Sequence, residues 1–175
     1  MDIVLSAHGG GGKLTEELIQ EVFLNEFDSD ILNEMEDSAV LDIDFNKLAF
    51  TTDSYTVKPL FFPGGDIGRL AVCGTINDLL TRGAVPLFLS ASFIIEEGFR
   101  LYDLKRIASS MARTCREAGA KIVAGDTKVV ARGDADGIFI NTSGAGYVPF
   151  GVNISVKNAK PGDKVIISGT IGDHG

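Results

Sequence analysis

Histidine and cysteine are scarce in this sequence, which narrows the chemistry open to it. Among 175 residues there are two histidines, His8 and His174, and two cysteines, Cys73 and Cys115. Zinc sites are built from clustered Cys and His ligands, so these scattered residues do not predict one. Each cysteine lies inside a helical pattern, which argues against a disulfide framework and fits small core residues in a reducing cytoplasm.

The sequence also has no excess of positive charge and no long apolar run. The net charge is −8, with acidic and basic residues interspersed. A nucleic-acid partner would need a basic face, so none is expected, whereas a nucleotide needs only a few local charges or a metal. No apolar run reaches the length of a membrane span, and residues 1–12 lack the basic region of a signal peptide. We therefore expect no membrane association.

Glycine, in contrast, is abundant and clustered, with 21 residues. The first block, Gly9–Gly12, precedes Lys13 and an amphipathic helical pattern. Backbone N–H groups of such a loop, with the lysine as a point charge, can hold phosphate. The spacing fits neither a Walker A loop nor G-x-G-x-x-G, because Leu14 occupies a required position in both. A floppy N-terminal segment is the alternative interpretation.

Residues 64–84 begin as a glycine turn and continue as a helix. Asp66 is the predicted N-cap, and Gly83 the residue that follows the helix. One helical stripe is apolar, then small, then acidic: Ile67, Leu70, Ala71, Gly74 and Asp78. A carboxylate on a buried face must be paired or bind a metal. Both roles remain open for Asp78.

Three further aspartates stand beside predicted strands. Asp37 begins a strand at residues 37–41, and Asp53 ends its predicted hairpin partner, so antiparallel pairing would bring both to one end of the sheet. Asp126 lies where the strand at residues 121–130 breaks. Turn chemistry is the alternative for each, since Asp is common at strand ends. With Asp78 they form a set of carboxylates suited to Mg²⁺, which prefers hard oxygen ligands and bridges them to phosphates.

The predicted order of elements favours an α+β fold. Strands and helices alternate incompletely, which argues against a doubly wound parallel sheet and favours a mixed sheet with helices on one face. Residues 103–118 give the clearest helix, with Asp103 as its cap and Gly119 as its stop. The strand at residues 87–95 is expected to be covered on both faces, and residues 132–137 to form a hairpin turn.

The sheet face away from the helices is expected to be exposed and rather apolar. Four phenylalanines could contribute to it: Phe45, Phe50, Phe88 and Phe93. A second copy of the chain is the simplest cover for such a face, which predicts a homodimer. Residues 1–150 are expected to form one domain, and residues 151–175 to begin a second.

Several of these motifs occur in the same order in a known family. HGGGGK, DSAVL, TTDS, FFPGGDIGRLAVCGTINDLLTRGA, GDTKVV and GTIGDHG resemble the hydrogenase-maturation branch of the PurM-like (aminoimidazole ribonucleotide synthetase) superfamily of ATP-using enzymes. The resemblance implies an α/β-sandwich N-terminal domain whose sheet pairs with that of a second copy. It also implies ATP in clefts near the dimer interface.

Site residues follow from the same resemblance by motif. It implies magnesium held by four aspartates: Asp37, Asp53, Asp78 and Asp126. It implies contacts with ATP from the glycine loop and from nearby polar residues: Gly9, Gly10, Gly11, Gly12, Lys13, Thr52, Asn77, Thr127 and Lys128.

The family reaction is the ATP-dependent dehydration of a carboxamide, carried on the sulfur of a C-terminal cysteine, to a thiocyanate. Its cyano group becomes an iron ligand in [NiFe] hydrogenase. The implied partners are the carbamoyltransferase HypF and a HypC–HypD complex as cyanide acceptor. No cysteine lies near the end of this sequence. We therefore expect this chain to bind Mg-ATP and dimerise, with no catalytic residue of its own.

Two alternatives differ from this prediction. The first is another member of the superfamily. A selenophosphate synthetase is expected to have a reactive cysteine before its glycine loop, and none is present here. A thiamine-phosphate kinase is expected to share the aspartates without the HGGGGK opening. A non-catalytic dimerisation or docking module for a carbamoyl-transfer partner is the second.

Overall fold

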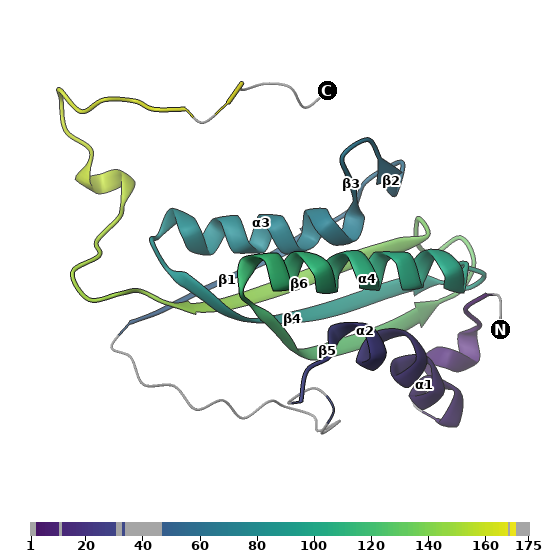
Figure 1. Ribbon diagram of the computed structural model, residues 1–175. Helices are drawn as coiled ribbons and strands as arrows, with labels where there is room; N and C mark the ends of the chain where they lie inside the picture. Colours follow the sequence, from purple (N-terminus) through teal and green to yellow (C-terminus); the bar gives the residue numbers. More distant parts are fainter. Residues whose placement is uncertain (1–2, 11, 31–32, 34–46, 168, 171–175) are drawn as a thin grey trace.

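A four-stranded sheet forms the centre of the molecule. The computed structural model describes residues 3–10, 12–30, 33, 47–167 and 169–170. The strands are β1 (Leu48–Tyr55), β4 (Val85–Glu96), β5 (Lys121–Val130) and β6 (Ile138–Tyr147). Their order is β1–β6–β4–β5, with antiparallel pairs except for the parallel pair β4–β5. Figure 1 shows α3 and α4 side by side over one face, which confirms the predicted α+β architecture.

Helix α4 (Leu101–Ala118) follows its predicted apolar stripe. Leu104, Ile107 and Met111 are fully buried against the sheet and the neighbouring helix. Gly119 ends the helix in the left-handed conformation, with φ of 70°. The predicted start was wrong: Arg100 occupies the N-cap position, and Asp103 lies inside the first turn. There its carboxylate complements the positive end of the helix dipole.

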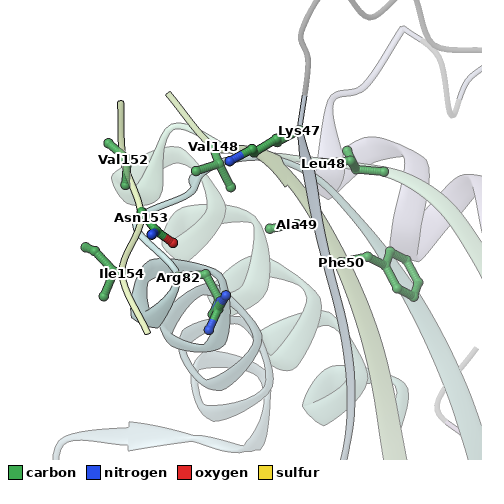
Figure 2. A pocket seen from close by; sticks show the side chains of 9 residues that line it. All are labelled: Lys47, Leu48, Ala49, Phe50, Arg82, Val148, Val152, Asn153 and Ile154. Carbon is green, nitrogen blue, oxygen red and sulfur yellow. The ribbon is translucent and has the colours of Figure 1, made fainter. Parts of the chain in front are cut away.

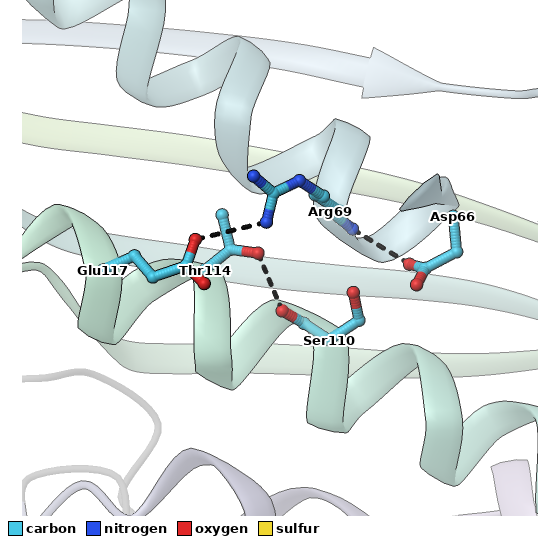
Figure 3. Close-up of polar contacts among 5 residues, drawn as sticks. All are labelled: Asp66, Arg69, Ser110, Thr114 and Glu117. Atoms are coloured by element: carbon cyan, nitrogen blue, oxygen red, sulfur yellow. Dashed lines mark hydrogen bonds and ion pairs between the residues drawn. The ribbon is translucent and has the colours of Figure 1, made fainter. Parts of the chain in front are cut away.

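Helix α3 (Ile67–Thr81) has the predicted caps but a different buried face. The Asp66 carboxylate accepts a hydrogen bond from the Arg69 backbone N–H at 3.0 Å, and the Arg69 side chain reaches Glu117 on α4 at 3.2 Å (Figure 3). Leu70 and Asp78 are exposed, because the helix packs on both α4 and the sheet and turns a neighbouring stripe inward. That buried stripe comprises Ile67, Gly68, Ala71, Val72, Thr75, Ile76 and Leu79.

The N-terminal segment packs into the same hydrophobic core. It contains η1 (Ser6–Gly9), α1 (Lys13–Leu18), a π-helical stretch η2 (Ile19–Leu24) and α2 (Asn25–Phe27). The rings of Phe23 and Phe93 stack with their centroids 4.7 Å apart. Phe93 is therefore only 3% exposed, and its predicted place on the open face was wrong. Phe45 lies outside the described residues.

The sheet face away from the helices, here called the open face, is more polar than expected. Phe50 is 68% exposed and Ile94 44%, so β4 is covered on one face and not on both. Between them the strand register places six hydroxyl and amide side chains: Thr52, Ser54, Ser90, Ser92, Asn141 and Ser143. Several are hydrogen-bonded across β1 and β6, for example Ser143 Oγ to Thr52 Oγ1 at 2.9 Å. The prediction of a mainly apolar face was wrong.

The connection between β5 and β6 is not the predicted hairpin. β4 lies between these two strands, so residues 131–137 must cross over its end. The Glu96 carboxylate holds this crossing by accepting hydrogen bonds from the N–H groups of Gly133, at 2.6 Å, and Gly137, at 3.0 Å. These two bonds hold the pKa of Glu96 below its usual value.

Smaller elements complete the described chain. β2 (Phe61–Phe62) and β3 (Gly65–Asp66) form a short hairpin that leads into α3. Beyond Gly151 the described residues are largely exposed, with one 3₁₀ turn, η4 (Val156–Asn158). The division into domains at residue 150 stays a prediction. Among the described residues, no helix combines the length and the apolarity needed to cross a membrane.

Candidate nucleotide and cation site

Two of the predicted aspartates lie near one another where β1 passes α3. Asp53 pairs in register with Thr142, which is fully buried and donates a hydrogen bond to the Ala71 carbonyl of α3. Asp53 therefore lies on the helix-covered face of the sheet. Two residues earlier on the same face, Thr51 Oγ1 donates to Asp78 Oδ2 at 2.9 Å. We call Thr51, Asp53 and Asp78 the carboxylate cluster.

Tyr55 adjoins the carboxylate cluster from the interior. It lies on the same face of β1 as Asp53 and is 8% exposed. Burial raises the pKa of its phenol, a hydrogen bond with Thr75 opposes that effect, and the Asp53 and Asp78 carboxylates raise the pKa further. The phenol is therefore protonated and available as a donor near neutral pH.

The carboxylate cluster has the donor set of a hard cation. Mg²⁺ is usually held by one or two carboxylates together with phosphate oxygens and water, so Asp53 and Asp78 fit it. The described residues contain no group of three or more His, Cys, Asp or Glu that would enclose an ion without further ligands. Asp37, the fourth predicted ligand, lies outside those residues. The cluster thus suits a metal that arrives with a phosphate.

The glycine loop lies at the opposite edge of the sheet, against β5. A Cβ added to Gly9 would stand 2.9 Å from both the backbone N and the Cβ of Val129, so only glycine permits this approach. Gly10, Gly12 and Lys13 follow and are exposed, and Gly11 falls outside the described residues. The loop thus lies beside the GDTKVV strand, and its phosphate-binding role stays a prediction.

Four other predicted residues do not join the carboxylate cluster within one chain. Asp126 pairs with Ser92, whose neighbours on β4 are buried under the helices, so Asp126 lies on the open face. Three strand spacings, roughly 14 Å, separate β5 from β1. Thr52 is also on the open face and Lys128 follows Asp126 there, whereas Thr127 faces the helices. Asn77 is exposed on α3 beside Asp78.

A groove of about 490 Å³ opens elsewhere, where the start of β1 meets the end of α3 (Figure 2). It contains two cationic side chains, Lys47 and Arg82, among mostly apolar neighbours. Its lining residues are Lys47, Leu48, Ala49, Phe50, Arg82, Val148, Val152, Asn153 and Ile154. None of them belongs to the predicted site, so this groove is distinct from the carboxylate cluster.

Sequence reasoning missed the buried hydroxyls behind the carboxylate cluster, namely those of Tyr55, Thr75 and Thr142. Two of them carried a usable signal. Tyr55 stands two residues after Asp53, the spacing of one strand face, and Thr75 stands three residues before Asp78, the spacing of one helix face. Thr142 is brought to them only by the pairing of β6 with β1.

The molecule has a mixed sheet under two long helices, with the carboxylate cluster at one edge and the glycine loop at the other. This arrangement defines an α/β-sandwich domain of the kind that the motifs of the sequence resemble. Residues 35–148 match the family described as AIR synthase related protein, N-terminal domain. The chain belongs to this family, and the resemblance inferred from its motifs is confirmed.

Its relatives narrow the comparison further. The chain is 56% identical over 169 residues to the carbamoyl dehydratase HypE of Rhizobium leguminosarum bv. viciae. The matched region covers 97% of this chain and 48% of that protein. It is 50% identical to HypE crystallised in complex with ATP, with a TM-score of 0.88 over 90% of this chain and 47% of the other. A HypE–HypF complex matches with 60% identity and a TM-score of 0.66 over 86% and 47%. The chain spans about half the length of these relatives.

Proposed function

We propose that this chain binds Mg-ATP, and that the whole protein uses it to dehydrate a cysteine-bound carboxamide to a thiocyanate. The observation that carries the proposal is the hydrogen bond from Thr51 to Asp78, which brings the second carboxylate to the edge where Asp53 lies. The similarity to carbamoyl dehydratases and to an ATP complex of HypE supports it.

The residues take different roles in this proposal. Asp53 and Asp78 hold the cation, and Thr51 fixes the orientation of Asp78. The glycine loop and Lys13 hold phosphate oxygens. The cation, when bound, offsets the negative charge that develops during phosphoryl transfer. The phosphorylated amide oxygen then becomes a leaving group. Further contacts, proposed from the family motifs, come from Asp37, Asp126, Thr52, Asn77, Thr127 and Lys128.

The proposal includes a homodimer. Asp126 and Lys128 lie on the open face, away from the carboxylate cluster, and a second copy seated on that face would enclose them. We further propose HypF as the carbamoyl donor and a HypC–HypD complex as the cyanide acceptor. The unpaired thiols of Cys73 and Cys115 fit a reducing cytoplasm as the place of this reaction.

Titration calorimetry with ATP, in the presence and absence of Mg²⁺, tests the cation assignment. We expect Asp53→Asn and Asp78→Asn each to weaken Mg-ATP binding at least about tenfold, or 1.4 kcal/mol. Asp134→Asn, an exposed carboxylate in the β5–β6 crossing, is the matched control and should bind as the unchanged chain does. Equal affinity in all three variants would rule out the carboxylate cluster as the cation site.

Light scattering tests the dimer. We expect the mass of two chains at micromolar concentration. A charge placed at the centre of the open face, as in Ser143→Glu, should shift the population toward the monomer because the charge would be buried in the interface. A monomeric mass of the unchanged protein over the whole concentration range contradicts this part of the proposal.

A further inference from the structure

The imidazole of His8 is a buried polar group that stands directly before the glycine loop. Its residue is only 1% exposed, and it is the one histidine in the part of the chain that the structure describes. His8 Nδ1 accepts a hydrogen bond from the Leu5 backbone N–H at 2.8 Å. The His8 backbone N–H in turn donates to the Leu5 carbonyl at 2.9 Å. These two bonds close the turn of η1 from both sides.

The residues before this turn are fixed to the connection between β4 and α4. Val4 is fully buried, and its N–H donates to the Phe99 carbonyl at 2.8 Å. The Gly98 N–H donates back to the Val4 carbonyl at 2.7 Å. The Ser6 N–H donates to the Glu97 carboxylate at 3.3 Å. The turn of η1 therefore starts from a fixed point of the fold.

The residues after His8 carry the direction of the turn into the glycine loop. Gly9 packs directly on Val129 of β5, and the Gly10 N–H donates to the Ala7 carbonyl at 3.3 Å. Lys13 then begins α1, whose continuation η2 buries its apolar side chains in the core. The exposed residues of the loop thus lie between two fixed ends, and η1 sets the direction in which they leave the first end.

We propose that His8 is a positioning residue for phosphate binding, and that its Nδ1, by holding the Leu5 N–H, sets the turn from which Gly10 and Lys13 face phosphate oxygens. This inference rests on the proposed function, which gives the glycine loop its phosphate role. His8 does not contact the phosphate in this proposal, because its ring is buried inside the fold.

The role requires an acceptor at one particular atom of the side chain. Nδ1 accepts a hydrogen bond only when it carries no proton, so a neutral His8 ring carries its proton on Nε2. Asparagine places its Oδ1 at the same number of bonds from Cβ as Nδ1, so His8→Asn keeps an acceptor for the Leu5 N–H. His8→Phe keeps a ring of similar size and removes the acceptor. His8→Gln moves the polar atoms one bond further from Cβ.

Long-range ¹H–¹⁵N correlation spectra test the hydrogen bond in the chain without nucleotide. We expect the His8 ring to be protonated at Nε2 and not at Nδ1. The chain has two histidines, so the variant His174→Asn assigns the signals. A ring protonated at Nδ1 in the folded chain would overturn the proposal, because such a ring cannot accept from Leu5.

Titration calorimetry with Mg-ATP tests the effect on binding. We expect His8→Phe to weaken binding about tenfold, the consequence of losing one buried hydrogen bond that orients the loop. His8→Asn should bind with an affinity close to that of the unchanged chain, and Lys13→Ala should bind more weakly. The matched control is Thr114→Val, which removes a buried hydroxyl on α4 and should leave the affinity unchanged.

The variants separate this inference from the proposed function. If Lys13→Ala weakens binding while His8→Phe leaves it unchanged, the positioning role is wrong and the phosphate role of the loop stands. The positioning role is also wrong if His8→Asn loses as much affinity as His8→Phe. If the unchanged chain does not bind Mg-ATP, or Lys13→Ala binds it normally, the phosphate role itself is wrong. Circular dichroism identifies folded variants, and His8→Asn against His8→Gln decides the question if His8→Phe does not fold.

Discussion

Helices α3 and α4 lie side by side on one face of the sheet, yet they are built differently. α4 buries large aliphatic side chains such as Leu104 and Ile107 and turns charged residues to solvent. α3 buries small or hydroxyl-bearing residues along much of its length, including Gly68, Ala71 and Thr75. A Cβ on Gly68 would stand 2.6 Å from the Ile107 carbonyl, so α3 approaches α4 closely because it lacks side chains there.

α4 therefore mainly stabilises the fold, whereas α3 also positions residues of the candidate site. α4 buries large apolar residues such as Leu104, Ile107 and Met111 and carries none of the predicted site residues. α3 gives up apolar volume so that Tyr55 fits beside Gly74 and Asp78 reaches Thr51. Four changes test this contrast, taken from the largest expected effect to the smallest.

Thiol labelling should distinguish the two helices most strongly. Burial raises the pKa of Cys115 on α4 to about 12, whereas Cys73 on α3 is partly exposed. The thiolate is the reactive form, so at pH 8 Cys115 should react about three orders of magnitude more slowly than an ordinary thiol. A folded chain should therefore show one fast thiol, lost in Cys73→Ser. Raising the pH should accelerate Cys115 about tenfold per pH unit up to that pKa, because its thiolate fraction rises throughout that range. Two fast thiols in the native protein would contradict the packing of α4.

Truncation of the α4 stripe should cost the most stability. Ile107 is fully buried, and Ile107→Ala should lower the free energy of unfolding by about 2–5 kcal/mol. Urea denaturation measures the loss. Arg113→Ala, at an exposed position of the same helix, is the control and should change stability little. A loss below about 1 kcal/mol at Ile107 would mean that α4 is less central than its burial indicates.

Adding a methyl group at Gly74 of α3 should lower the stability of the protein, although alanine favours a helix more than glycine does. Gly74→Ala would gain roughly 1 kcal/mol as a helix former. The overlap with Tyr55 should reverse that gain and give a net loss of about 1–3 kcal/mol. Tyr55→Phe in the Gly74→Ala background should recover part of the loss, because the overlapping oxygen is gone. A net gain from Gly74→Ala alone would show that the phenol can move freely.

The smallest effect is expected from one polar atom on α4. Ser110 Oγ is the buried side-chain oxygen without a hydrogen-bond partner in the described part of the chain. Ser110→Ala should therefore raise the free energy of unfolding by about 1 kcal/mol. Thr114→Val is the contrasting control, since its hydroxyl donates to the Ser110 carbonyl at 2.8 Å and its removal should give no gain (Figure 3). A loss of stability in Ser110→Ala would indicate a partner for that hydroxyl.

Local patterns in the sequence predicted much of the fold. The period of α4, its stop at Gly119 and the cap at Asp66 depend on neighbouring residues only, and all three are confirmed. Sheet order depends on contacts far apart in the chain. β6 pairs with both β1 and β4, which turned a predicted hairpin at residues 132–137 into a crossing. Phe93 was assigned to the wrong face for a related reason, because a shift of one residue reverses every side chain of a strand.

Local sequence patterns predicted the candidate site to a similar extent. Asp53 was predicted from its place at the end of a strand and Asp78 from its place on a helical stripe. The structure brings Asp78 to Thr51, which lies two residues from Asp53 on the same face of β1. The side on which Asp126 lies could not be inferred, since it depends on an irregularity in the pairing of β4 with β5 between Leu89 and Ser90. The partners Thr75 and Thr142 are 67 residues apart in sequence, and no local pattern connects them.

The Glu96 carboxylate has a consequence for acid conditions. It holds both ends of the β5–β6 crossing through the N–H groups of Gly133 and Gly137, which keeps its pKa low. A carboxyl whose pKa is lower in the folded state stabilises that state above the unfolded pKa and stops doing so as the pH falls through the folded value. The crossing should therefore loosen on acidification, visible as a joint change in the Gly133 and Gly137 amide resonances. Glu96→Gln should show the loosened state already at neutral pH.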